Sequence, residues 1–98
     1  MTVEDIEHLR ILKAALAEEI RDVRRLIEQI AEVVVSDEDF ALANTEQLQA
    51  FDLAIQRADE SADMLERLSS GSSPHSAIDA VRLACVQDRL RAALKSAA

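Results

Sequence analysis

The sequence predicts an all-α fold: a long antiparallel helical hairpin plus a shorter third helix, expected to complete a helical bundle as a homodimer. Of its 98 residues 49% are hydrophobic, only 2% are aromatic, and there is a single Gly and a single Pro. Many good helix formers, with few aromatic residues and few breakers, favour helices over strands. At this length, one helical domain over residues 1–98 is expected.

The first helix is predicted over about residues 3–35. Thr2 is a suitable N-cap, and Glu4 and Asp5 suit the positive end of the helix dipole. Apolar residues then recur in alternating steps of three and four, a pattern typical of coiled coils. One heptad position holds Ile6, Lys13, Ile20, Ile27 and Val34, a second holds Leu9, Leu16, Val23 and Ile30, and the seam is widened by Leu12, Leu26 and Val33. Such a wide seam favours a bundle helix over a two-stranded zipper.

The second helix is predicted over about residues 38–69. The polar run 36–39 ends the first pattern, and Ser36 or Asp37 can cap a new helix after a tight turn, which implies antiparallel neighbours. The second apolar series consists of Leu48, Phe51, Ile55, Ala58, Ala62 and Leu65. The polar stretch 44–47 could hold a kink or a second start capped by Thr45. A continuous helix matches the first in length, and it is therefore preferred.

A loop is predicted over residues 69–76, and a third helix over about 77–95. The loop holds the only Gly and the only Pro, within a serine tract. Ser76 and Asp79 form a capping pair for the third helix. Apolar residues lie on two sides of that helix, but it is too short to cover both long seams. A second copy of the chain is therefore the expected partner, and a further protein could bind the remaining apolar helix surface.

Composition argues against several classes of partner. The net charge of −8 disfavours nucleic acid, and Arg21, Arg24 and Arg25 are interleaved with acidic residues, as on a solvated helix face. There is no basic start and no run of 18 apolar residues, so neither a signal peptide nor a membrane span is predicted. The lone Cys85 is interpreted as a small buried residue, and a reducing, cytoplasmic location is expected.

Sequence signatures of enzymes are absent, and no metal or cofactor is expected. There is no phosphate-cradling loop or nucleophile elbow, and the histidines have no second ligand at metal-binding spacing. His8 is interpreted as a surface histidine, with phosphotransfer as an alternative. The histidine phosphotransfer family has Lys-Gly soon after its reactive histidine. Here Lys13 comes later, and the residue directly after it is Ala14 and not glycine.

One short motif lies in the predicted second helix, where residues 48–56 read LQAFDLAIQ. Asp52 and Gln56 are four residues apart, so they project from one helix face, and a leucine follows the aspartate. This segment resembles the signature of the CheZ-type chemotaxis phosphatases, which are dimers of long helical hairpins. Ala54 and Ile55 stand where that family has Thr-Gly. The resemblance covers about nine of the 98 residues.

The resemblance implies dephosphorylation of a phospho-aspartyl response regulator. Gln56 would orient the attacking water, and Asp52 would contact the regulator's active-site lysine. A solvated polar face explains the same residues, because it also holds Gln49, Asp59 and Asp63. The leading expectation is therefore a small oligomeric helical interaction module, placed in bacterial-type signalling, with a phosphatase or response-regulator binder as the alternative.

Overall fold

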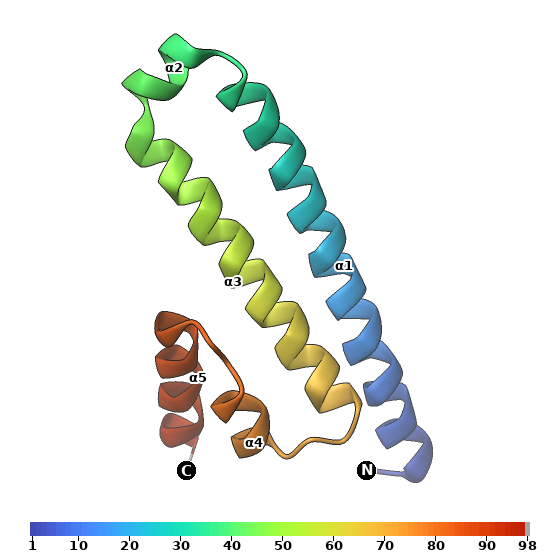
Figure 1. Ribbon diagram of the computed structural model, residues 1–98. Coiled ribbons are helices and arrows are strands. Elements are labelled where there is room, and N and C mark those ends of the chain that lie inside the picture. Colours follow the sequence, from blue (N-terminus) through green and yellow to red (C-terminus); the bar gives the residue numbers. More distant parts are fainter. Residues whose placement is uncertain (98) are drawn as a thin grey trace.

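The computed structural model describes residues 1–97, which form five α-helices and no strand, so the all-α class is confirmed. The helices are α1 (Val3–Val35), α2 (Glu38–Ala43), α3 (Thr45–Ser69), α4 (Pro74–Asp79) and α5 (Ala84–Ala97). The long helices α1 and α3 lie side by side and run in opposite directions, with α2 between them along the chain (Figure 1). Helices α4 and α5 contact α3.

Helix α1 begins and ends where the sequence predicts. Thr2 Oγ1 accepts a hydrogen bond from the Asp5 N–H at 3.0 Å, and the Thr2 N–H donates to the Asp5 carboxylate at 3.2 Å. This reciprocal capping box satisfies two backbone donors at the helix start. At the other end Ser36 terminates α1, and Asp37 caps α2 by accepting a hydrogen bond from the Phe40 N–H at 3.1 Å.

The continuous helix predicted over residues 38–69 is instead two helices, α2 and α3, separated at Asn44. Asn44 has φ −128° and ψ 37°, and its side-chain amide donates to the Phe40 carbonyl at 2.9 Å. The Thr45 hydroxyl also lies 3.3 Å from the Leu42 carbonyl. Short polar side chains that bond to nearby backbone carbonyls compete with the helical ladder. The break in the polar stretch was therefore the correct alternative, although Thr45 begins α3 rather than capping it.

Small residues allow α1 and α3 to pack closely. Ala17 and Ala62 are almost completely buried, with exposed fractions of 1% and 0%. Near the end of the pair, Ser69 Oγ donates to the Arg10 carbonyl at 2.9 Å. Because Ser69 is the last residue of α3, the residues of α1 before Arg10 extend beyond it. This N-terminal overhang, residues 3–9, is about 10 Å long at the helical rise per residue.

A glycine ends α3. Gly71 has φ +97°, its N–H donates to the Leu68 carbonyl at 3.2 Å, and the Ser72 N–H donates to the Arg67 carbonyl at 3.0 Å. These two bonds form a Schellman motif, which needs a residue with positive φ at this position. The only glycine in the chain therefore turns the backbone away from α3.

The predicted third helix over residues 77–95 is also wrong in detail, because two helices, α4 and α5, occupy this region. Helix α4 starts earlier, with Ser73 as N-cap and Pro74 in the first turn, where a missing N–H has no cost. The chain leaves the helix after Asp79. There the Gln87 amide donates to the Ile78 and Val81 carbonyls at 3.1 and 3.2 Å. These contacts satisfy carbonyls that a continuous helix would have paired internally.

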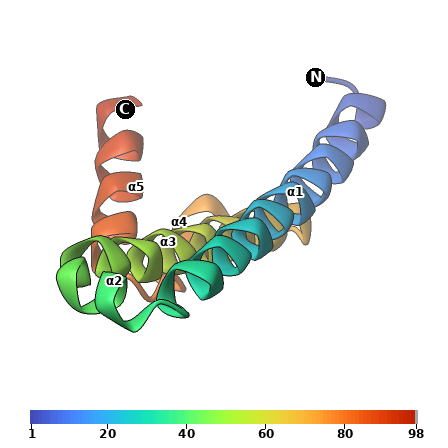
Figure 2. The ribbon, with the colours of Figure 1, turned by 90° about the horizontal axis from the view of Figure 1, so that it is seen from above.

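The interior is small. The buried apolar residues are Ala17, Ala62, Ala77, Ile78 and Val81. No large side chain of residues 1–97 falls below 2% exposure. Viewed from above, α5 and the N-terminal part of α1 rise on the same side of α3 (Figure 2). No helix in the described part of the chain combines the length and apolarity required to cross a bilayer.

Candidate functional site

The most extensive candidate site is a line of exposed aliphatic residues along α1, here called the α1 stripe. Its members are Leu9, Leu12, Leu16, Val23, Leu26, Ile30 and Val33, and their exposed fractions range from 39% to 73%. They follow steps of three and four, as in a coiled-coil seam, with exposed Glu19 at the one position of the series that is not aliphatic.

The α1 stripe lies beside the line of α1 that faces α3. Lys13, Ile20, Ile27 and Val34 of the first heptad position are half-buried, and the neighbouring Ala17 is buried, so this line of α1 contacts α3. The sequence had placed both heptad positions on one seam. In the structure α3 partly covers the first position from Lys13 to Val34, whereas Ile6, in the N-terminal overhang, is exposed. The second position and the widening residues Leu12, Leu26 and Val33 are also exposed.

The opposite flank of the α1–α3 pair, here called the ionic flank, is held by charged residues. The Arg21 guanidinium donates to Asp63 at 3.2 Å and also binds Glu66 and Glu18. Arg24 Nε lies 2.6 Å from an Asp59 carboxylate oxygen, an ion pair without hydrogen-bond geometry. At 100° per residue, these positions lie on the other side of the α3-facing line from the α1 stripe.

Arg21 is the centre of this flank. Its side chain is 26% exposed. The hydrogen bond to Glu66 raises the pKa of Arg21 above its ordinary value, more than partial desolvation lowers it, and the bonds to Asp63 and Glu18 act in the same direction. The guanidinium therefore remains charged, and these cross-helix contacts satisfy it within the protomer.

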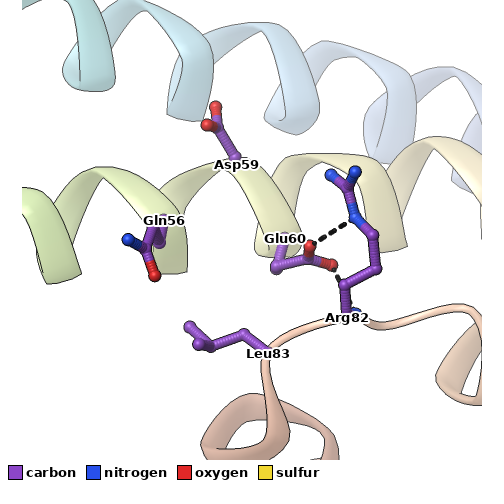
Figure 3. A pocket seen from close by; sticks show the side chains of 5 residues that line it. All are labelled: Gln56, Asp59, Glu60, Arg82 and Leu83. Atoms are coloured by element: carbon purple, nitrogen blue, oxygen red, sulfur yellow. Dashed lines mark hydrogen bonds and ion pairs between the residues drawn. The ribbon is translucent and has the colours of Figure 1, made fainter.

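A second candidate site is a shallow open groove of about 300 Å³ between α3 and the α4–α5 connection. It is lined by Gln56, Asp59, Glu60, Arg82 and Leu83 (Figure 3). Glu60 is only 5% exposed. Its carboxylate accepts hydrogen bonds from the Arg82 backbone N–H at 3.2 Å and from Arg82 Nε at 3.0 Å. Arg82 therefore anchors the α4–α5 connection on α3, and the charges of Glu60 and Asp59 are already paired.

The two residues of the sequence motif are both accessible. Asp52 and Gln56 are exposed and lie one turn apart on α3. Gln56 lines the groove, whereas Asp52 does not. Sequence reasoning missed the Glu60–Arg82 pair beside Gln56. The sequence could show that Gln56 and Glu60 share a helix face, because they are four residues apart. It could not show that Arg82, 22 residues after Glu60, would bind there.

The other residues with reactive or metal-binding side chains lie apart from one another. His8 is exposed on α1, with Nε2 3.9 Å from a Glu4 carboxylate oxygen. Cys85 is exposed, so its predicted burial is wrong. The break before α5 changes the helix phase, so Ile78 and Val81 are buried while Cys85 is not, and its sulfur lies 3.6 Å from an Arg57 nitrogen. No group of three metal-binding side chains occurs among residues 1–97.

Comparison with known proteins returned no relative. No family model matches the chain, no curated protein matches it, and no solved structure matches its fold.

Proposed function

We propose that the chain is a small non-enzymatic helical module that self-associates through the α1 stripe and so presents helix surface to other proteins. In this proposal the α1–α3 pair acts as a hairpin that is completed to a bundle by a second copy. The supporting observation is the line of seven exposed aliphatic residues at coiled-coil spacing. Scattered exposed apolar residues are ordinary, but a contiguous patch of this kind marks an interaction surface.

The size of the stripe fits a dimer interface. Seven aliphatic residues at these exposures present on the order of 700 Å² per copy, close to the ~800 Å² per partner of a standard interface. The protomer also lacks large, fully buried side chains among residues 1–97. Burial of the stripe would therefore supply much of the apolar contact that the isolated protomer lacks.

The test is solution mass. Sedimentation equilibrium at tens of micromolar is expected to give a dimer for the unmodified chain. Leu16→Glu places a charge within the stripe and is expected to weaken association at least 100-fold. Leu53→Glu is the matched control, because Leu53 is 43% exposed on α3 and lies outside the stripe. A monomeric unmodified chain would overturn the proposal, as would equal effects of the two substitutions.

A second candidate function is favoured by the accessibility of Asp52 and Gln56. In this proposal the chain binds a phospho-aspartyl response regulator, in bacterial-type signalling, and Gln56 orients the attacking water while Asp52 contacts the regulator. Both side chains are exposed, and hydrolysis of an acyl phosphate requires mainly a positioned water, because the regulator supplies the metal.

The second candidate is tested with a receiver domain loaded by a small acyl phosphate. The unmodified chain is expected to accelerate dephosphorylation, and Gln56→Ala to abolish the acceleration. Gln49→Ala is the control, since Gln49 is an exposed glutamine on the same helix. Equal rates with and without the unmodified chain would exclude this function, and they would leave the interaction module as the remaining proposal.

A further inference from the structure

The α1 stripe has an internal symmetry about its midpoint. Its first and last members, Leu9 and Val33, lie equally far from Arg21, and the same holds for each pair between them. If a second α1 runs antiparallel and the two helices cross at residue 21, every member of the series meets another member. The resulting layers are Leu9 with the partner's Val33, Leu12 with the partner's Ile30, Leu16 with the partner's Leu26, and Glu19 with the partner's Val23.

We propose that the occupant of the α1 stripe is the α1 stripe of a second copy, antiparallel and centred on residue 21. This inference rests on the proposed self-association and adds its direction and register. All eight positions of the series are matched in this register. A shift by one heptad in either direction leaves the terminal positions without a counterpart, so it buries less apolar surface.

Glu19 argues for the antiparallel direction. In a parallel pair in register, each heptad position faces itself, so Glu19 would meet the partner's Glu19 within the seam. Two carboxylates facing each other in a partly dry interface repel strongly. In the antiparallel register Glu19 lies at the level of the partner's Val23, and its carboxylate can reach the edge of the seam.

The ends of the molecule give an independent argument. The N-terminal overhang carries Val3, 85% exposed, and Ile6, 56% exposed. At the opposite end of α1, Phe40 and Leu42 of α2 are 46% and 80% exposed. In the antiparallel register residue 7 lies at the level of the partner's Val35, where the partner's α1 ends, so residues 3–6 extend past that end toward the partner's α2. The overhang of each copy thus reaches the α2 region of the other, whereas a parallel pair would leave the two kinds of end about 50 Å apart.

Cysteine crosslinking tests direction and register. In a Cys85→Ala background, the double variant Leu16→Cys/Leu26→Cys is expected to form a covalent dimer as its main product under mild oxidation. Either single variant is expected to give less than a tenth as much, because like positions are about 15 Å apart along the antiparallel axis. An equimolar mixture of the two single variants is expected to crosslink.

Several outcomes would overturn the inference. Efficient crosslinking of each single variant would show a parallel pair, and more efficient crosslinking of Leu16→Cys/Val33→Cys would show a register shifted by one heptad. In either case the proposed self-association would stand. A monomeric mass for the unmodified chain would instead remove the proposed function and the inference together.

Cysteines within the stripe could themselves impair association, so a second test places a spin label outside it. Ile11 is 49% exposed and lies off the stripe. Spin labels at Ile11→Cys, again with Cys85→Ala, are expected to be roughly 30 Å or more apart in the proposed register, from 20 residues at 1.5 Å each. A separation below about 20 Å would contradict it.

Discussion

The two flanks of the α1–α3 pair differ in where their side chains find partners. On the ionic flank, Arg21 and Arg24 of α1 are paired with Asp59, Asp63 and Glu66 of α3, all within one protomer. On the other flank, the seven aliphatic residues of the α1 stripe remain between 39% and 73% exposed. Charged groups tolerate solvent and apolar groups do not, so the flank left without partners is the one that gains most from association.

The largest expected effect comes from completing the apolar flank. Glu19→Leu replaces the one charged position of the series by the residue that the pattern favours. Burial of one more leucine per copy, with removal of a charged side chain from the seam, is expected to tighten self-association by roughly 10- to 100-fold. Sedimentation equilibrium over a dilution series measures it. Glu32→Leu is the control, because Glu32 is an exposed glutamate of α1 outside the series, and an equal gain there would contradict the assignment of the stripe.

The next effect concerns the ionic flank. Arg21→Ala leaves Glu18, Asp63 and Glu66 close together without their cation, and it is expected to lower the free energy of unfolding by about 1–2 kcal/mol. Urea denaturation measures the change. Arg25→Ala is the matched control, because Arg25 is 58% exposed and its one ion pair among residues 1–97 is with Asp22 of the same helix. Dissociation of the dimer by Arg21→Ala, without loss of stability, would contradict the division between the flanks.

A substitution outside both flanks, at Gly71, is a reference for changes that affect the stability of the protomer but not its association. Gly71→Ala is expected to cost about 1 kcal/mol, because an alanine is strained at φ +97°. Apart from Gly71 and its two chain neighbours, no described heavy atom lies within 4 Å of the added Cβ, so the cost comes from local backbone strain and not from a clash with another part of the fold. Thermal unfolding measures it, with Ser72→Ala as the control. The dimer mass is expected to be unchanged.

The smallest expected effect is that of salt, which should weaken the ion pairs of the ionic flank without weakening association through the α1 stripe. Raising NaCl from 0.05 to 1 M is expected to lower the stability of the protomer by less than about 1 kcal/mol, because it screens partly exposed ion pairs. Apolar association is not screened, so the dimer is expected to persist or tighten. A dimer that dissociates at high salt would show that charge, rather than the α1 stripe, holds it together.

Local chemistry explains which parts of the fold could be predicted from the sequence. The all-α class, the limits of α1 and the caps at Thr2 and Asp37 depend on neighbouring residues, and they were correct. The break between α4 and α5 was not foreseen. It depends on Glu60, which binds Arg82 from another helix, and on Gln87, which caps carbonyls that a continuous helix would have used.

The α1 stripe could likewise be predicted only in part from the sequence. The heptad pattern identified both apolar positions of α1 but could not assign one to α3 and the other to solvent, since both are aliphatic and adjacent. That assignment follows from Ala17, which allows α3 to approach, and from the charged residues that bind across the pair at Arg21 and Arg24. The exposure of Asp52 and Gln56 was likewise not decided by their spacing. It required the position of α3 relative to α1 and α4.

The small alanine-lined interior has a thermodynamic consequence. A protomer whose largest side chains stay partly solvated has little stability in reserve, and a ligand that binds only the folded form adds to it by mass action. When that ligand is another copy of the chain, the melting temperature should rise with the protein's own concentration. Dilution would then weaken the fold as well as the complex, so the amount of protein present would determine how much of it is folded.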